Sequence, residues 1–308
     1  MKSDAHGDER GLDLYPTSRP TVSALEEILG KEISVLDKGF IRVVDYMGND
    51  AAIVQAARVS YGKGTKSTSE DAALIKYLMQ HLHTTPFEMC EIKLHVKLPI
   101  FVARQWVRHR TANINEYSAR YSVLEREFYV PSAADISEQS TSNKQGRGGS
   151  IPSDYGQRVR ELMIKDAEQA FDRYEGFLQG DKSADEADTG AGIARELARI
   201  GLPLSTYTQW YWKIDLHNLF HFLRLRSDNH AQLEVRLYAQ EILKIVERWV
   251  PQAYAAFLEH QIGGTRLSKS AVETLSRLLR GEKLSQLDSG LSRREWVDLM
   301  KIFDAPGG

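Results

Sequence analysis

One stretch of the chain concentrates residues that can hold an anion. Residues 108–122, RHRTANINEYSARYS, carry three arginines, a histidine and a glutamate, although the 308-residue chain has a net charge of only −2. Guanidinium groups bind phosphate in a bidentate manner, and serine hydroxyls and backbone N–H groups can complete such a cradle. Glu116 would repel a phosphate, so we expect it to orient an arginine or to accept from a ribose hydroxyl. The stretch therefore predicts a site for a mononucleotide or a dinucleotide.

The segment DLHNLFHFLRLR, residues 215–226, contains a further candidate for binding an anion. On a helical wheel Leu219 and Phe220 belong to an apolar stripe, and Arg226 falls seven residues after Leu219, beside that stripe. An arginine turned toward the interior needs an anionic or electron-rich partner, because an unpaired buried charge is very costly. A bound ligand and an internal Asp or Glu both satisfy this requirement, and the sequence leaves the two open.

The same segment raises a metal site as an alternative. His217 and His221 are one helical turn apart, and Asp215 and His230 are close in the sequence. Such residues are common zinc ligands. No H-E-x-x-H frame is present, however, and paired histidines on a helix are often simply polar positions. We expect no metal.

Two familiar phosphate-binding loops are not expected. GKGTKS, residues 62–67, has the composition of a P-loop but not its spacing, and no G-x-G-x-x-G occurs. Any dinucleotide must therefore be bound without the glycine-rich device of a Rossmann fold.

Cys90 is the single cysteine of the chain, which excludes an intramolecular disulfide and any site built from several cysteines. In MCEIKLHVKLP, residues 89–99, apolar and polar residues alternate, and Cys90 falls on the apolar face with Ile92 and Leu94. A thiol among apolar side chains keeps a high pKa and stays unreactive. We therefore expect Cys90 to pack in the core rather than to act as a nucleophile.

The composition is that of an ordinary globular protein, with 42% apolar and 27% charged residues. Near-neutrality argues against binding a nucleic-acid polymer, which normally requires a broad basic face. No stretch approaches the roughly 18 apolar residues of a membrane span, and residues 1–20 lack the apolar centre of a signal peptide. Together with the single cysteine, these features predict a cytoplasmic protein with no membrane partner.

Short strands followed by long helices indicate an α+β fold. A helix is expected to begin at Pro99 and to run out near Asn113, which places Arg108–Arg110 in its last turn and residues 111–121 in a loop. Strands are expected within residues 31–48 and 90–98, and further helices over 154–180, 185–200, 204–226 with a possible break near Asp215, and 231–261.

Composition also suggests how the chain is divided. Residues 1–28 are expected to form a flexible arm, and 29–263 the main domain. Within that domain the Gly/Ser-rich segment 132–153 is expected to be a mobile insertion. Residues 264–308 are expected to be a helical extension.

With these elements in place, the arginine-rich stretch resembles the signature of flavin-dependent thymidylate synthases, R-H-R-x-x-S-x-N-E-x-S-x-R-Y. The matching residues are Arg108-His109-Arg110, Asn115-Glu116, Ser118 and Arg120-Tyr121, with Asn113 where serine is usual. Three further blocks resemble the family's in order and spacing: HTTPFEM (83–89), PIFVARQWVRHR (99–110) and LRLRSDNHAQLEVR (223–236).

The resemblance implies a thymidylate-synthase-complementing-protein-like fold, with a mixed sheet and long helices, in a homotetramer with interfacial active sites. It implies reductive methylation of dUMP to dTMP, with 5,10-methylenetetrahydrofolate as one-carbon donor and NADPH-reduced FAD as reductant. The residues it assigns to dUMP are Gln105, Trp106, Arg108, Glu116, Tyr117, Ser118, Ala119, Arg120, Arg199 and Arg226. Those it assigns to FAD are Thr85, Arg108, His109, Arg110, Glu116, Asp215, His217 and His221, with His83 and His230 as neighbours.

The resemblance also assigns roles. Arg226 is expected to polarise the uracil ring as the catalytic residue, without a protein nucleophile, and Ser118 is expected to bind phosphate rather than to attack. Two other functions remain open on the residues alone. An RNA- or nucleotide-binding module would use the arginines with Trp106 and Tyr117 and bind oligonucleotides in a salt-dependent manner. A metal-dependent nucleotide hydrolase would use His217 and His221 and be inhibited by chelators.

Overall fold

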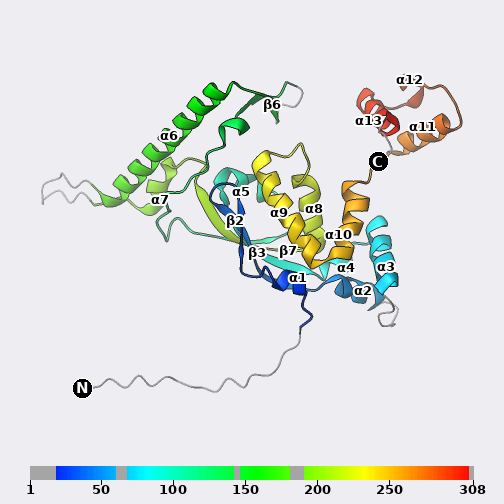
Figure 1. Ribbon diagram of the computed structural model, residues 1–308, viewed down its shortest axis with the longest axis horizontal. Helices are drawn as coiled ribbons and strands as arrows, with labels where there is room; N and C mark the ends of the chain where they lie inside the picture. Colours follow the sequence, from blue (N-terminus) through cyan, green and yellow to red (C-terminus); the bar gives the residue numbers. More distant parts are fainter. Residues whose placement is uncertain (1–18, 60–67, 142–145, 181–190, 305–308) are drawn as a thin grey trace, which may run out of the picture. The chain divides into compact units, whose positions relative to one another are not determined.

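The computed structural model describes residues 19–59, 68–141, 146–180 and 191–304. Its centre is a five-stranded sheet in the order β1-β2-β3-β7-β4, with antiparallel pairing between all neighbouring strands (Figure 1). The α+β class is confirmed, but the expectation of a mixed sheet is wrong. Long helical connections can return the chain in either direction, so the sequence pattern does not fix strand direction. The strands are β1 Glu32–Val35, β2 Gly39–Met47, β3 Glu91–Pro99, β7 Tyr207–Asp215 and β4 Asn113–Glu116.

The region after β3 differs from its prediction in two ways. Helix α5, Ile100–Trp106, begins directly after Pro99 as expected, but it ends before Arg108–Arg110, which follow the helix instead of forming its last turn. Residues 113–116, expected in a loop, form strand β4, which pairs with β7 from Asn113↔Lys213 to Glu116↔Trp210. The ladder that β7 offers outweighs the weak strand propensity of Asn113-Ile114-Asn115-Glu116.

The largest departure is β7, because residues 204–226 were expected to be mostly helical. In YTQWYWKID the buried residues Trp210, Trp212 and Ile214 alternate with less buried ones, which is the period of a strand. The possible break near Asp215 is the junction between this strand and helix α8, Leu216–Arg226. Asp215 caps the helix, since its Oδ1 accepts from Asn218 N at 2.9 Å.

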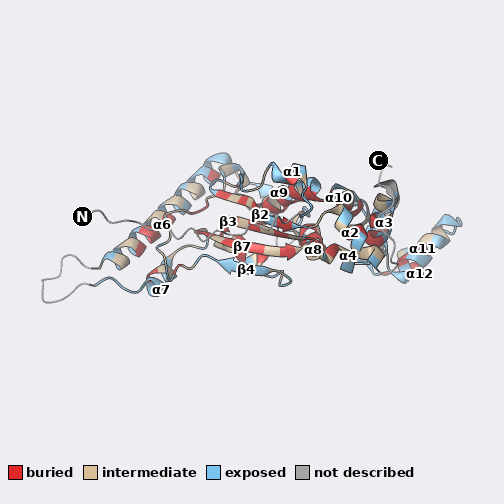
Figure 2. Cartoon of the chain, turned by 90° about the horizontal axis from the view of Figure 1, so that it is seen from below, coloured by how far each residue is buried: buried red, intermediate tan, exposed pale blue. Residues whose placement is uncertain are grey.

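Helices α5, α8 and α9, Leu233–Trp249, contact the central sheet and bury an aromatic core. The ring of Trp106 lies 4.7 Å from that of Phe222 and 5.1 Å from that of Trp212, centroid to centroid. Aromatic side chains of this size each bury about 150–250 Å², so this cluster holds the ends of α5 and α8 in fixed positions. Figure 2 shows buried residues concentrated along β2, β3 and β7.

Two further groups of helices flank the sheet. Helix α2, Asp50–Arg58, contacts both α3, Thr68–Gln80, and α4, Thr85–Glu88, and α4 also contacts α8. Helix α6, Ser153–Gln179, confirms the prediction for 154–180 and packs through Phe171 and Tyr174 on Phe128. Within the described part of 185–200, only α7, Arg195–Ala198, and the start of the 3-10 turn Arg199–Gly201 are helical. The expected helix over 231–261 comprises α9, α10, Pro251–Phe257, and a π-helical turn, Leu258–Ile262.

The segment 132–153 contains regular structure. It has a 3-10 turn, Ala133–Asp135, and a small sheet of β5, Ser137–Gln139, and β6, Arg147–Ser150. Its mobility stays a prediction. The glycine-rich loop 62–67 lies outside the described residues.

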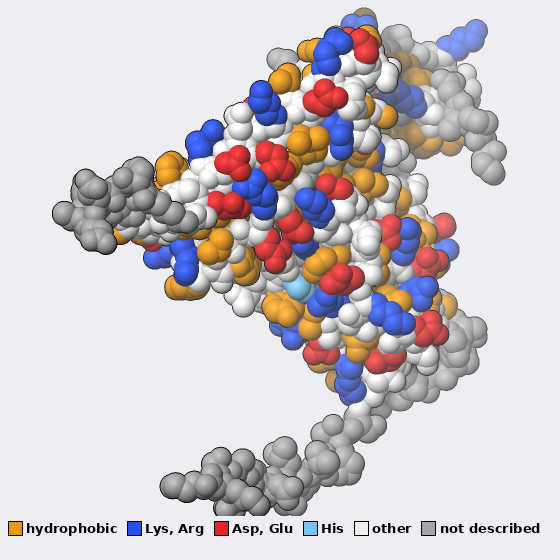
Figure 3. Space-filling model, turned by 60° about the vertical axis from the view of Figure 1, so that its left-hand side comes forward, with side chains coloured by type: hydrophobic (Ala, Val, Ile, Leu, Met, Phe, Trp, Pro, Cys, Tyr) orange, Lys and Arg blue, Asp and Glu red, His pale blue; other side chains and the backbone are white. Residues whose placement is uncertain are grey.

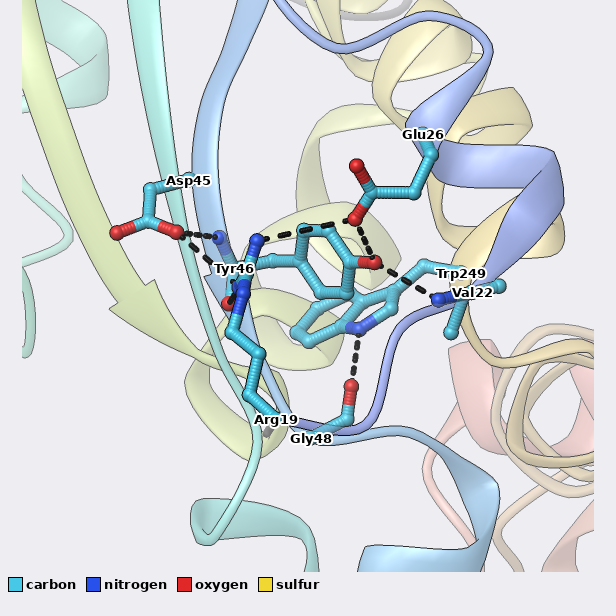
Figure 4. A network of polar contacts seen from close by, with 7 residues as sticks. All are labelled: Arg19, Val22, Glu26, Asp45, Tyr46, Gly48 and Trp249. Atoms are coloured by element: carbon cyan, nitrogen blue, oxygen red, sulfur yellow. Dashed lines mark hydrogen bonds and ion pairs between the residues drawn. The ribbon is translucent and has the colours of Figure 1, made fainter. Parts of the chain in front are cut away.

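The first described residues are tied to the sheet (Figure 4). Arg19 Nη1 donates to the carbonyl of Tyr46 at 2.7 Å, and the Tyr46 hydroxyl donates to Glu26 of α1, Ser23–Glu26. Beside it, Trp249 Nε1 donates to the carbonyl of Gly48 at 2.8 Å. These bonds fix the start of the described chain against β2.

The chain divides into two compact units, residues 1–256 and 257–308. The second has its own small core of Ala271, Leu291 and Leu299. Its helices are α11 Lys269–Leu279, α12 Gln286–Ser289 and α13 Arg293–Asp304, and Leu291 lies between the last two. Within the described ranges, no helix has the length and apolar character needed to cross a membrane. Figure 3 shows one face on which Lys/Arg and Asp/Glu side chains are interspersed.

Candidate active site

The end of α8 and the residues after α5 meet at Arg226. This half-buried guanidinium donates from Nε to His109 Nε2 at 3.0 Å and from Nη2 to the carbonyl of Gln105 at 3.4 Å. In the described part of the chain it forms no ion pair with a carboxylate. The sequence left two partners open for this arginine, an internal Asp or Glu and a bound ligand. The described residues provide no such Asp or Glu, which favours a ligand.

The electrostatics of this group follow from burial. Burial, and then the charge of Arg108, lower the pKa of Arg226 from its ordinary value. Burial, followed by the charges of Arg226 and His221, lowers the pKa of His109 to about 4. His109 is therefore neutral near pH 7. Because arginine can only donate, His109 Nε2 must carry the lone pair and Nδ1 the proton.

Three of the residues expected to contact FAD belong to α8: Asp215 at its N-cap, and His217 and His221 within it. His217 is half-buried. The His221 ring is 5.9 Å from that of His109, and burial is the main cause of its lowered pKa. Asp215 is occupied as the helix cap. Exposed His230 accompanies Asp228 at 2.7 Å instead of joining them. Among the described residues, no three His, Cys, Asp or Glu side chains form a group that could hold a metal.

Gln105 and Trp106 occupy adjacent positions with different surroundings. Trp106 has 0% exposure and its ring packs in the aromatic core, so its contact with dUMP stays a prediction. Gln105 is half-buried, and its Nε2 donates to Gln232 Oε1. Gln232 in turn donates to the buried carboxylate of Glu234 at 2.8 Å. Gln232 and Glu234 were not singled out from the sequence, although both lie in the block 223–236 that carries the resemblance.

A second group forms where the chain leaves β4. Arg120 pairs with Glu196 of α7 at 3.2 Å, and its backbone N–H lies 3.4 Å from Ser118 Oγ. Arg120, Tyr121, Arg195 and Glu196 help to line a cavity of about 540 Å³. Ala119 is buried, and Arg199 is half-buried in the turn after α7. In the described residues no hydrogen bond or ion pair joins this group to Arg226.

The remaining predicted residues lie around these two groups. Glu116 accepts from Thr208 Oγ1 at 2.7 Å and, with Tyr117, lines a cavity of about 200 Å³. Arg108 and Arg110 are exposed. Thr85 and His83 line a separate cavity of about 820 Å³ beside α2 and α3.

The surroundings of Cys90 are those of a core residue. It has 0% exposure, and burial raises the pKa of its thiol to about 12. The prediction that it packs in the core is confirmed.

Several known proteins are similar to this chain in sequence and fold. The family model "Thymidylate synthase complementing protein" matches residues 42–252. A flavin-dependent thymidylate synthase of Anaplasma marginale (strain St. Maries) is 58% identical over 299 residues, covering 97% of this chain and 99% of that protein. One of Gluconobacter oxydans (strain 621H) is 56% identical, covering 94% and 92%. Among solved structures, the UMP/dUMP methylase PolB from Streptomyces cacaoi bound with 5-Br dUMP matches with a TM-score of 0.64 and 32% identity, covering 75% of this chain and 99% of that chain.

Proposed function

The chain belongs to the thymidylate synthase complementing protein family, and from this premise we propose that it is a flavin-dependent thymidylate synthase that converts dUMP to dTMP. The one-carbon donor is 5,10-methylenetetrahydrofolate, and NADPH supplies the electrons through FAD. The reaction is cytoplasmic. The relatives' names support the flavin, and the PolB complex with 5-Br dUMP supports the nucleotide.

One observation carries the proposal: Arg226 is half-buried beside a neutral histidine and a backbone carbonyl. A guanidinium held in this way retains donors for an electron-rich ligand. Against a uracil ring it would stabilise negative charge that develops as C5 attacks an electrophilic carbon. Because its position is already fixed by His109 and Gln105, little reorganisation is needed when the substrate arrives.

The other residues fit the remaining parts of the two ligands. Ser118, Arg120 and Arg199 supply the hydroxyl and guanidinium donors that a phosphate requires. Arg120 would exchange Glu196 for the phosphate, which is a small loss because that pair is largely exposed. Glu116 accepts from Thr208, and its other oxygen suits a ribose hydroxyl.

The residues around the Arg226 group also fit a flavin. Arg108, Arg110 and the protonated Nδ1 of His109 are donors. His217 and His221 lie on α8, the helix that also carries Arg226, and Asp215 caps the start of that helix. Thr85, the first residue of α4, lines the cavity beside α2 and α3, and α4 contacts α8. When bound, FAD supplies the reducing equivalents, while these residues hold and orient it.

No protein nucleophile takes part. The thiol of Cys90 has a pKa of about 12 and is buried, so it is neither ionised near pH 7 nor accessible.

We further propose a homotetramer whose active sites lie between subunits. The Arg226 group and the Ser118–Arg120 group share no hydrogen bond or ion pair within the described part of one chain. In the assembly, a phosphate cradle from one subunit would complete the ring-binding group of another.

The test is spectroscopic. The purified protein should be yellow, with flavin absorbance, and should oxidise NADPH in a reaction that depends on dUMP or the folate and yields dTMP. A colourless protein that FAD cannot reconstitute would exclude this function. Salt-dependent oligonucleotide binding would then favour the nucleotide-binding module, and inhibition by chelators would favour the metal-dependent hydrolase.

A further inference from the structure

Glu234 is a buried carboxylate in the first turn of α9, with only 2% of its side chain exposed. Three side chains converge on it. Arg147 of β6 pairs with it, the Tyr129 hydroxyl donates at 3.2 Å, and Gln232 Nε2 donates at 2.8 Å. A carboxylate in such a position is tolerated only when charge and lone pairs are matched. Arg147 balances the charge of Glu234, and Tyr129 and Gln232 donate to its oxygens. These contacts also fix the orientation of the partners.

An ionised carboxylate only accepts hydrogen bonds, so each partner must donate to it. Burial and the charge of Glu234 raise the pKa of Tyr129, which keeps its hydroxyl protonated as a donor. Gln232 must turn its Nε2 toward Glu234, and its Oε1 then faces Gln105. Gln105 must in turn donate its own Nε2 to Gln232. One buried charge thus sets the amide orientation of two successive glutamines.

Gln105 is also part of the Arg226 group, because its backbone carbonyl accepts from Arg226 Nη2. One N–H of Nε2 is committed to Gln232, which fixes the orientation of the amide. Its Oε1 is then the only acceptor that the side chain has for another partner, beside the second N–H of Nε2. Among the hydrogen bonds of the described residues, none is made to this oxygen. Arg226 offers donors only, and its Nη2 lies 3.4 Å from the backbone carbonyl of Gln105. A ligand that reaches both side chains would therefore meet a donor from Arg226 and an acceptor from Gln105.

We propose that Glu234 and Gln232 are positioning residues that hold Gln105 with its Oε1 ready to accept from a donor group of the bound nucleotide. This rests on the proposed function, in which the ligand is dUMP. A uracil ring carries C=O beside N3–H, which complements a donor next to an acceptor. Cytosine carries an unprotonated N3 at the same place and would face the Gln105 oxygen with a lone pair. The relay therefore contributes to the choice of uracil over cytosine.

The first variant is Glu234→Gln, which keeps the shape of the side chain but lets Gln232 take either orientation. The flavin-loaded protein should bind dUMP about tenfold more weakly by calorimetry, as expected when one oriented hydrogen bond is lost. Its preference for dUMP over dCMP should fall by a similar factor. Glu241→Gln is the matched control, since Glu241 lies on the same helix and pairs with Lys244 at the surface. It should match the wild type in both measurements.

The second variant separates orientation from structural support. In the double variant Gln232→Glu/Glu234→Gln, the carboxylate moves one step along the relay and again accepts from Gln105 Nε2. Both the affinity for dUMP and the preference over dCMP should recover. If the buried charge only stabilised α9 and the β5–β6 hairpin, moving it would restore neither. Failure to recover in a folded double variant would overturn the proposal.

Gln232→Leu covers the case in which Glu234→Gln does not fold. It leaves the contacts of Glu234 with Tyr129 and Arg147 intact and removes the two hydrogen bonds of Gln232, one to Glu234 and one from Gln105. Wild-type affinity and preference in this variant would also overturn the proposal. The activity of the wild type distinguishes failure of the proposed function from failure of the positioning role. If the wild type shows no dUMP-dependent turnover, the proposed function is wrong. If the wild type turns over normally and the variants bind dUMP and dCMP as it does, only the positioning role is wrong.

Discussion

Two half-buried arginines of this chain have opposite surroundings. Arg126, with 33% of its side chain exposed, contacts three carboxylates of α6: Glu168 at 2.8 Å, Asp172 at 2.7 Å and Glu175 at 2.8 Å. Arg226 contacts a neutral imidazole and a backbone carbonyl. Hydrogen bonds to its carboxylates raise the pKa of Arg126, whereas burial and Arg108 lower the pKa of Arg226.

The difference separates a structural arginine from a functional one. The charge of Arg126 is neutralised within the fold, so its bonds contribute to folding and leave nothing for a ligand. The charge of Arg226 is only partly compensated, which costs stability and leaves an oriented group for an electron-rich substrate. Substitution of Arg226 should therefore lower activity, and substitution of Arg126 should lower stability.

The largest effect is expected for Arg226→Ala. Loss of a group that stabilises transition-state charge typically lowers kcat by about 10²–10³-fold. The melting temperature should stay the same or rise, because a poorly compensated charge has been removed. Steady-state dTMP formation and thermal unfolding measure the two quantities. Near-normal turnover would mean that another group polarises the ring.

His109→Ala should have a smaller effect, because it removes the acceptor that orients Arg226 Nε and leaves the guanidinium in place. One misplaced hydrogen bond corresponds to about a tenfold loss in kcat/KM. His109→Gln, whose side-chain oxygen can still accept, is the matched control and should recover part of the rate. Equal losses in the two variants would argue against an orienting role.

The protonation of His109 gives a pH dependence. Its pKa of about 4 in the folded chain is below the ordinary value of 6.5, so the unfolded chain binds more protons between these values. Its contribution to stability is therefore complete above about pH 6.5 and is lost as pH falls toward 4. In Arg226→Ala the pKa should rise but stay below 6.5, because burial is the larger cause. An NMR titration of the histidines follows both values.

The same two arginines show what the sequence could and could not predict. The helical wheel placed Arg226 beside the apolar stripe, and the structure confirms that it is half-buried. The pattern could not say what Arg226 meets, since His109 is 117 positions earlier in the chain. Nothing in the local sequence marked Arg126, because its partners lie on a helix more than forty residues later.

Strands and helices were predictable where the period was unambiguous. The alternation around Cys90 gave β3, whereas β7 was taken for a helix despite the alternation of Trp210, Trp212 and Ile214. That strand continues directly into α8, so a helical period at the end of the segment obscured the strand period at its start. Strand β4 had no local signal, because its pairing with β7 is a tertiary effect.

Arg126→Met should reverse the outcome of Arg226→Ala. Three carboxylates on α6 would lose their shared cation and repel one another, so the melting temperature should fall. Turnover below the transition should remain within about twofold of the wild type, since this group is committed to the fold. Arg158→Met, which removes an exposed i,i+4 pair on the same helix, is the control and should change the melting temperature less. A loss of turnover in folded Arg126→Met would contradict the division between the two arginines.

The smallest effect is expected for Cys90→Ala. This variant tests whether a buried side chain that has no partner in the proposed site can be removed without loss of activity. The cost in stability should be about 1 kcal/mol, because one buried sulfur is lost, and kcat/KM should stay within about twofold of the wild type. A thiol reagent offers an independent check on the wild type. With a pKa of about 12 and no exposure, Cys90 should be modified at pH 8 only as fast as the surrounding core opens. Rapid modification, or inactivation that dUMP prevents, would instead place the thiol in the active site and require a nucleophile in the reaction.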